Sequence, residues 1–303
     1  MSSTTDQPRD RLPHPDAHQV MVPVTDGVSL RVLVREPAAP RGDAPLVLLI
    51  HGLASNARMW DGVGAALAAS GYRSAAVDLR GHGLSSKPDQ GYDFATICAD
   101  LCALLDHFGT ERAVFVGQSW GGNVVVHAGY AHADRVVGVV AVDGGMIELS
   151  RRFPDWDDCA TALRPPALAG LPFSRFEPNV RAMNRDWPET GINGSLANFE
   201  VLPDGTIRPW LTLDRHMQIL RSLWEHRPSA LYPHIDRPVL FLPADSGDVA
   251  WTNDKQQAVD AALAALDRGA VEWFRPAHHD LHAQHPQRCA EVIVHHIENG
   301  FLQ

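Results

Sequence analysis

The stretch VFVGQSWGGNVVV, residues 114–126, changes character in its middle. An apolar run rich in valine stops, Ser119 stands between Gly117 and Gly121, and a helix-compatible stretch follows. β-Branched runs favour strands, and small residues let a strand and the helix after it approach closely. A G-x-S-x-G pattern at such a junction predicts a strained turn that raises the hydroxyl of Ser119 above a sheet as a nucleophile. The alternative interpretation is a glycine-rich turn that only packs the helix on the strand.

Patterns of strand and helix alternate on both sides of this motif. Asp26-Gly27 predicts the turn of a hairpin over residues 19–37. The runs typical of buried strands are APLVLLIHG (44–52), RSAAVDLRGHG (73–83), RAVFVG (112–117) and RVVGVVAVDGG (135–145). Buried strands that alternate with helices predict an α/β fold whose parallel sheet is covered on both faces.

The alternation is interrupted after Met146 by residues 147–234, which contain many prolines and helical patterns but no buried-strand pattern. The expected elements after this break are a strand within RPVLFLPADSGD (237–248), a helix from about Lys255, a strand over 270–276 and a last helix from about Pro286. The alternation therefore resumes where it stopped, which indicates that one α/β core carries an insertion.

The domain division follows from this break. We expect an α/β core formed by residues 19–146 and 235–303, with residues 147–234 inserted as a mainly helical cap. Residues 1–18 are polar and contain prolines, and they lack the apolar stretch of a signal peptide. We expect this N-terminal segment to be poorly ordered.

Composition and charge narrow the class of partner. The 303-residue chain has a formal net charge of −10, which argues against nucleic acid or an anionic membrane surface. No apolar run reaches the length that a membrane span requires, and the four cysteines lack the spacing of a zinc site. These observations favour a cytoplasmic protein that acts on a small molecule, and a homodimer is compatible with the sequence.

Five stretches of the chain form a joint pattern. They are LLIHGLASNARMW (48–60), AVDLRGHGLSSKP (76–88), VGQSWGG (116–122), RPVLFLPADSGD (237–248) and AHHDLHAQHP (277–286). In this order they resemble the α/β-hydrolase superfamily, in the cap-bearing branch of serine hydrolases that contains esterases and lactonases. The resemblance implies a mostly parallel, eight-stranded α/β-hydrolase sheet covered by helices on both faces, with an inserted and mainly helical cap.

A serine hydroxyl needs a base that takes its proton, and the base needs a third group that fixes its tautomer. In the resembled family this base is a histidine that lies several residues before the proline opening the last helix. Counting back from Pro286 implies His279 as the base, with His278 as its nearest rival.

The resemblance leaves the acid of the triad open among three aspartates. Its usual place is the loop after VLFLP, where Asp245 and Asp248 stand, and Asp248 is the first choice. Relatives carry a glycine after this strand and the acid three residues later, whereas here Ala244 replaces the glycine and Asp248 comes one residue late. Some relatives place the acid after the next strand beyond the nucleophile, which is Asp143 here. A turn aspartate that caps its own backbone is the other interpretation of Asp143.

Acyl transfer also requires two N–H donors that converge on the developing oxyanion. The backbone N–H of Trp120 lies at the start of the helix after Ser119 and is the first candidate. The resemblance implies Leu53 as the second donor, with Gly52 allowing the backbone to approach the site. His51 is expected to shape this loop by a hydrogen bond, and Arg80 is expected to pair with a carboxylate.

A serine nucleophile, a histidine base and an oxyanion hole indicate acyl transfer through an acyl-enzyme. The resemblance favours a carboxylic ester or lactone with a bulky apolar or aromatic substrate, and it implies neither a metal nor an organic cofactor. Epoxide hydrolases and haloalkane dehalogenases of this fold use an aspartate where Ser119 stands. Candidate substrate contacts, for which packing within the cap is the other interpretation, are Trp156, Trp187, Trp210 and Trp224.

Two other functions remain alternatives at this point. A carbon–carbon hydrolase of a dienoic ketoacid shares the triad and the helical cap. A ligand receptor with slow turnover is the second alternative, because a fold does not by itself determine function. Turnover of simple esters beside a dienoic ketoacid distinguishes the three.

Overall fold

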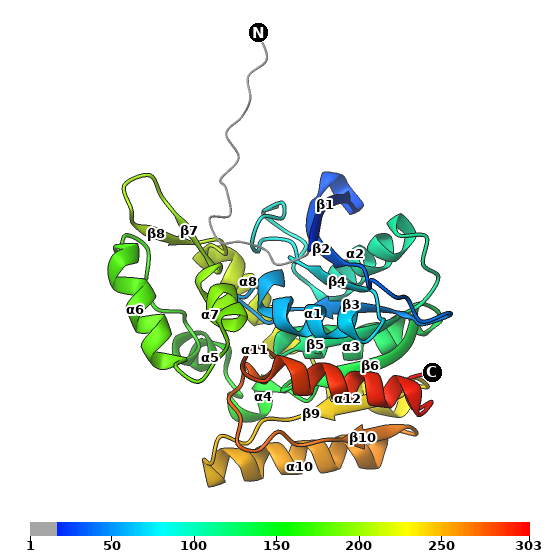
Figure 1. The fold of residues 1–303 in the computed structure, drawn as a ribbon. Coiled ribbons are helices and arrows are strands. Elements are labelled where there is room, and N and C mark those ends of the chain that lie inside the picture. Colours follow the sequence, from blue (N-terminus) through cyan, green and yellow to red (C-terminus); the bar gives the residue numbers. More distant parts are fainter. Residues whose placement is uncertain (1–16) are drawn as a thin grey trace.

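The computed structural model describes residues 17–303, apart from the side chain of Asp26. An eight-stranded sheet forms its centre, with the strand order β1-β2-β4-β3-β5-β6-β9-β10 (Figure 1). The strands are β1 (His18–Pro23), β2 (Ser29–Arg35), β3 (Leu46–Ile50), β4 (Ser74–Val77), β5 (Ala113–Gln118), β6 (Val136–Val142), β9 (Val239–Leu242) and β10 (Gly269–Val271). β2 is antiparallel to β1 and β4, and the other neighbours are parallel. The predicted mostly parallel sheet of eight strands is confirmed.

Helices cover both faces of this sheet. They are α1 (Asp61–Ala69), α2 (Phe94–His107), α3 (Trp120–Ala131), α10 (Val249–Ala265), α11 (Leu281–Gln284) and α12 (Pro286–Glu298). Side chains alternate along β3, so that Leu48 lies in the apolar cluster with α2 and α3, whereas Val47 and Leu49 lie in the cluster with α1 and α12. This alternation explains the continuous apolar run of β3, because neither of its faces meets water.

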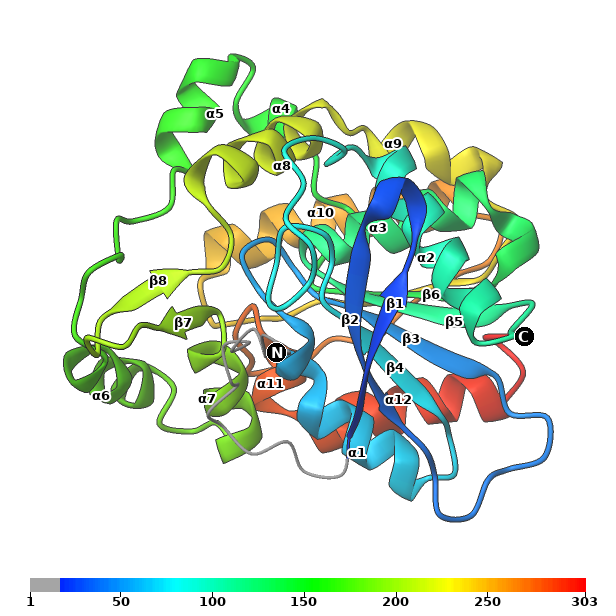
Figure 2. The ribbon, with the colours of Figure 1, turned by 90° about the horizontal axis from the view of Figure 1, so that it is seen from above.

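The segment between β6 and β9 contributes the remaining elements, some of which pack against the core. It contains α4 (Leu149–Arg152), α5 (Trp156–Ala162), α6 (Phe173–Met183), α7 (Glu189–Leu196), β7 (Phe199–Val201), β8 (Ile207–Pro209), α8 (Leu213–Glu225) and α9 (Pro228–Leu231). Both views place α5 to α8 and the β7–β8 hairpin together at one side of the core (Figure 2). The antiparallel hairpin is an addition to the helices expected here, since its strands are too short for a clear sequence pattern.

Several element boundaries differ from the sequence expectations, and β10 ends at Val271 rather than at residue 276. Helix α10 begins at Val249 rather than near Lys255, because the Asp248 side chain accepts a hydrogen bond from the Trp251 backbone N–H, 3.0 Å away, and caps the helix. The expected N-terminal segment 1–18 lies outside the described residues except for its last two, and β1 already begins at His18. Within residues 17–303, no helix has the length and apolar character to cross a bilayer.

Candidate active site

Ser119 occupies a sharp turn between β5 and α3. Its backbone lies at φ 55° and ψ −120°, a conformation that L-residues rarely adopt and that is often found at functional sites. The Ser119 N–H donates to the Val142 carbonyl at 2.9 Å, which ties the turn to β6. A Cβ atom on Gly117 would collide with the Gly121 carbonyl, and one on Gly121 would contact the backbone of residues 50–51. Both glycines are therefore required by close backbone approach, as the motif predicted.

His279 lies in the loop between β10 and α11. Its Nδ1 is 2.7 Å from Asp143 Oδ2, and half of its side chain, 53%, is exposed. The Gln118 side chain donates to the His279 carbonyl at 3.3 Å, which holds this loop against the end of β5, next to Ser119. The rival His278 has an exposed side chain, and its backbone N–H donates to Gln284. The structure therefore brings His279 to the serine turn and pairs it with a carboxylate.

Asp143 follows the last residue of β6, and its side chain is only 3% exposed. It has φ 41°, so its backbone too is in the left-handed region. While Oδ2 faces His279, Oδ1 accepts hydrogen bonds from the Ala244 N–H at 2.8 Å and from Lys255 Nζ at 2.6 Å. Burial raises the pKa of Asp143, but the hydrogen bond and charge of His279, the charge of Lys255 and the Ala244 N–H outweigh it, so the pKa is lowered. Asp143 is therefore a carboxylate at neutral pH.

The first choice of acid, Asp248, is corrected by this geometry. Asp248 is exposed and caps α10, and it does not contact His279. Asp245 accepts from the Gly247 N–H and the Thr252 hydroxyl and pairs with Arg275. The physical reason is that the chain enters α10 directly after the β9 loop, so that the late aspartate becomes the helix cap. The alternative candidate, Asp143, is the carboxylate that meets His279.

The pKa of His279 is raised above the usual histidine value. Incomplete hydration lowers it, but the hydrogen bond to Asp143 and the charges of Asp143 and Asp280 outweigh this effect, while the charge of Lys255 opposes them. Since Nδ1 faces the carboxylate, it carries the ring proton, and Nε2 is left to exchange protons with another group. A base with this tautomer is what a serine hydroxyl needs.

The expected oxyanion donors are the backbone N–H groups of Leu53 and Trp120. Neither has a hydrogen-bond acceptor within residues 17–303. A Cβ atom on Gly52 would contact the side chains of Gln118 and Ser119, so the glycine lets the loop after β3 lie directly against the serine turn. The loop that carries Leu53 thus packs against the serine turn, next to the first residue of α3, Trp120.

Two buried histidines support the loop that carries Leu53. His51 donates from Nδ1 to the Gly52 carbonyl at 2.7 Å, and its Nε2 accepts the Leu79 N–H at 3.0 Å. His82 Nε2 accepts the N–H of Ala54 at 3.3 Å, which holds this residue at φ 58°. Burial lowers the pKa of both histidines, so both stay neutral and keep these bonds. The structural role expected for His51 matches its contacts.

Arg80 lies in the loop after β4. It makes a bidentate pair with the buried Asp100, with both N–O distances at 2.7 Å. Asp78 accepts from Arg31 Nε at 2.7 Å and from the backbone of Ala57 and Leu84. These contacts brace the loops around the serine turn, and the expected pairing of Arg80 with a carboxylate is confirmed.

The four tryptophans named as substrate contacts fall into two groups. Trp156 and Trp224 contact each other, with ring centroids 5.9 Å apart, and the guanidinium of Arg221 stacks on both rings. Their contacts are therefore within the inserted segment. Trp187 is buried beside Met59 and α11, with an unpartnered indole N–H, and Trp210 lies under Lys87. Trp187 and Trp210 therefore contact segments outside the inserted one, at Met59, α11 and Lys87.

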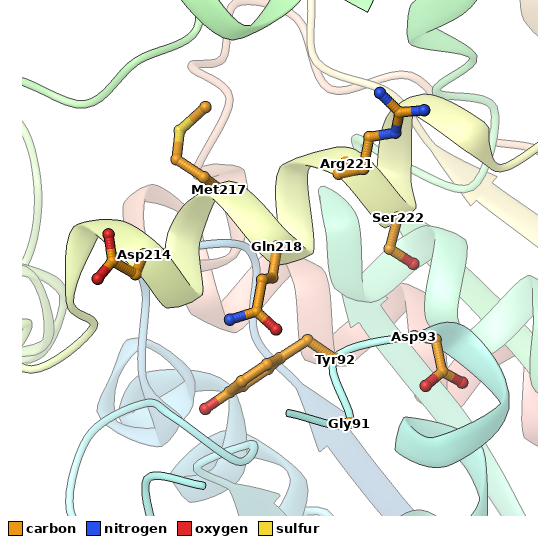
Figure 3. Close-up of a pocket in the computed structure, with 8 residues that line it drawn as sticks. All are labelled: Gly91, Tyr92, Asp93, Asp214, Met217, Gln218, Arg221 and Ser222. Carbon is orange, nitrogen blue, oxygen red and sulfur yellow. The ribbon is translucent and has the colours of Figure 1, made fainter. Parts of the chain in front are cut away.

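A groove of about 620 Å³ separates α8 from the loop that precedes α2. Figure 3 shows the side chains of α8 on one side of the groove and those of Tyr92 and Asp93 on the other. Neither Ser119 nor His279 lines it. The groove is therefore distinct from the Ser119 turn, although α8 is fastened nearby by the hydrogen bonds of Arg215 to the carbonyls of Lys87 and Pro88.

Two further residues of the site were not found from the sequence. Gln118 joins the serine turn to the His279 loop, and Lys255 contacts the acid. The one signal in the sequence is that Lys255 is one of only two lysines among the 26 lysines and arginines. Its position relative to Asp143 depends on the packing of α10, which no local pattern encodes.

Comparison with known proteins agrees with this fold. The alpha/beta hydrolase family matches residues 47–292. Epoxide hydrolase A of Mycobacterium tuberculosis is 47% identical over 259 residues, which cover 83% of this chain and 71% of that protein. The E-2-(acetamidomethylene)succinate hydrolase structure superposes with a TM-score of 0.74 at 23% identity, covering 93% of this chain and 99% of that one. The enol-lactonase of Burkholderia xenovorans LB400 gives 0.63 at 20% identity, covering 92% and 100%. The chain belongs to the alpha/beta hydrolase family.

Proposed function

We propose that this protein is a serine hydrolase that cleaves a carboxylic ester or lactone of a bulky apolar or aromatic substrate through an acyl-enzyme. The observation that carries the proposal is the His279–Asp143 pair, which the Gln118 hydrogen bond holds beside the strained turn of Ser119. A nucleophile, a base and an acid that orients the base are the three parts that acyl transfer requires.

The proposed reaction uses these groups in sequence. Ser119 Oγ attacks the carbonyl carbon while His279 Nε2 takes its proton, and Asp143 stabilises the resulting imidazolium through Nδ1. The carbonyl oxygen becomes an oxyanion that accepts from the N–H groups of Leu53 and Trp120. The leaving alkoxide takes the proton from His279, which leaves an ester on Ser119. Water, deprotonated by His279, then releases the acid and restores the hydroxyl.

The serine separates this proposal from the activity named for the relative in M. tuberculosis. A carboxylate that opens an epoxide forms an ester, which water can hydrolyse in a second step. A serine oxygen that opened the same ring would form an ether, and neither His279 nor an activated water could release it. Ser119 therefore favours substrates with a carbonyl group, for which serine chemistry is reversible by water.

Aromatic side chains near the site support a bulky apolar substrate. Trp187 and Trp210 lie in the inserted segment and are not part of the Trp156–Trp224 contact. Large aromatic surfaces bind apolar substrates by burial, with a few polar groups fixing their orientation.

Covalent labelling with a fluorophosphonate tests the nucleophile. We expect one adduct by intact mass on the parent protein and none on Ser119→Ala, since the reagent mimics a carbonyl and reacts with an activated serine. A parent that is folded but takes no label would contradict the proposal and favour a receptor.

A panel of esters and lactones beside an epoxide and a dienoic ketoacid then identifies the type of bond that the protein cleaves. Turnover of only the ketoacid would instead support the carbon–carbon hydrolase.

The pH dependence of labelling tests His279 as the base. Because only the neutral imidazole takes a proton, the rate should fall as the pH drops through the pKa of His279. This pKa is raised, so the midpoint is expected above 6.5, the ordinary histidine value. Rates measured from pH 5 to 9 should reach a plateau on the alkaline side. A flat profile, or a midpoint below 6.5, would contradict the role of the Asp143–His279 pair.

A further inference from the structure

Lys255 contacts the candidate acid from the second turn of α10. Its Nζ lies 2.6 Å from Asp143 Oδ1 and 2.6 Å from the Ala244 carbonyl, and its side chain is only 9% exposed. The other lysine of the chain, Lys87, binds carbonyls in the loop after β4. All remaining basic side chains, apart from the histidines, are arginines. Lys255 is therefore the lysine whose ammonium binds a carboxylate, whereas Lys87 binds backbone carbonyls.

The contacts of Lys255 divide the two oxygens of Asp143 between different partners. Oδ1 is held by Lys255 and by the Ala244 N–H, which leaves Oδ2 to His279. The Ala244 N–H alone would hold Oδ1 by one neutral hydrogen bond, and the ammonium adds a stronger, charge-assisted one that limits rotation about the Cβ–Cγ bond. The compact ammonium can donate to Oδ1 and to a carbonyl at the same time, whereas a planar guanidinium fits one carboxylate fork. Lys255 therefore restrains the acid.

We propose that Lys255 is a positioning residue that orients Asp143 and sets the pH range in which His279 acts as a base. The proposal rests on the function proposed above. Lys255 touches neither the serine nor the expected oxyanion donors, so it acts on the reaction through its contact with Asp143 and through its charge near His279.

Charge supplies the second part of the effect. Asp143 and Asp280 favour the protonated form of His279, and the charge of Lys255 opposes them. Asp245 also lies in the field of Lys255, but it is paired with Arg275. Removal of the ammonium leaves the charges of Asp143 and Asp280 uncompensated and raises the pKa of His279. The neutral base is then available only at higher pH.

Three substitutions at Lys255 separate charge from orientation. Lys255→Met removes both the charge and the hydrogen-bond donor. Lys255→Gln retains a donor without charge, and Lys255→Arg retains the charge. Arg237→Gln is the matched control, because it also removes one positive charge, at the opposite end of β9, where Arg237 pairs with Asp236. Thermal unfolding shows first that each variant is folded.

The decisive measurement is the pKa of His279 by NMR of the imidazole, with its signals assigned from a His279→Asn protein. This measurement does not depend on activity. We expect Lys255→Met and Lys255→Gln to raise the pKa of His279 by about one unit, because both remove a positive charge that is hydrogen-bonded to Asp143, the partner of His279. Lys255→Arg and Arg237→Gln should leave this pKa unchanged. An unchanged or lowered pKa in Lys255→Met would overturn the proposal.

Fluorophosphonate labelling gives the second readout. At pH 7 the rate constant should fall about 10- to 100-fold in Lys255→Met and less in Lys255→Gln, because small displacements of a catalytic group have effects of this size. The midpoint of the pH profile should move by the same amount as the pKa. If the parent reacts at Ser119 but Lys255→Met has the parent's rate and midpoint, the role of Lys255 fails while the serine hydrolase stands. If the parent does not react and the pKa still rises, the proposed function fails and the control of His279 by Lys255 stands.

Discussion

Replacement of either Ser119 or His279 by alanine is expected to lower kcat for an ester by about 10⁶-fold, because each removes a group without which the acyl-enzyme does not form. Ser119 supplies the oxygen that becomes acylated. His279 is the proposed base, since its Nδ1 is engaged by Asp143 at 2.7 Å and its Nε2 is left to take the proton. The measurement is a single-turnover assay on the ester that the panel identifies, with protein concentrations high enough to detect residual rates.

The double variant Ser119→Ala/His279→Ala should be no slower than either single variant. Residues that act as one unit have strongly non-additive effects, since a base without its nucleophile has nothing to activate. The residual rate then reflects binding and the N–H groups of Leu53 and Trp120. His278→Ala is the matched control, because its side chain is exposed and lies one residue away. A large loss in His278→Ala with activity retained in His279→Ala would contradict the assignment.

The second large effect is expected at the acid. Asp143→Asn should lower kcat by about 10⁴-fold, since an amide does not stabilise the imidazolium and favours the wrong tautomer of the base. The same substitution leaves Lys255 without its carboxylate in a nearly buried position. Thermal unfolding and circular dichroism therefore accompany the kinetic measurement, so that loss of the fold is recognised.

Asp248→Asn is the matched control for this variant. It makes the same change of atoms and charge, and asparagine caps a helix about as well as aspartate, so α10 should remain intact. We expect its kcat to stay within about twofold of the parent, as is usual for an exposed side chain without contacts to the site. Loss of activity in Asp248→Asn, with Asp143→Asn active, would show that the acid lies after β9 rather than after β6.

The core of the fold and the strained turn at Ser119 were predictable from short-range patterns. The turn around Ser119 depends on glycines at 117 and 121, where any Cβ atom would meet backbone, so the requirement is visible in the residue types themselves. The apolar runs of β3, β5 and β6 are equally local, because a strand buried on both faces excludes polar residues from every position. His279 was implied by the resemblance to the α/β hydrolases, in which the histidine lies several residues before the proline that opens the last helix, here Pro286 of α12.

The acid and its partner were not predictable in this way. Asp143 and Asp248 both follow strands, and both lie in turns that an aspartate can cap, so residue type and spacing do not separate them. Which of them meets His279 depends on where the chain places α10. Once Asp248 becomes the N-cap, the second turn of that helix brings Lys255 to Asp143.

The amino-acid sequence by itself determined the sheet of alternating strands and helices, the strained serine turn and the histidine loop, because each depends on periodicity or on residues close together in the chain. Only the tertiary structure decided that Asp143 is the carboxylate beside His279 and that Lys255 holds it. The physical reason is that these contacts join residues 136 and 112 positions apart, at the edge where β6, the β9 loop and α10 meet. Their geometry comes from the packing of whole elements, which no single stretch of sequence contains.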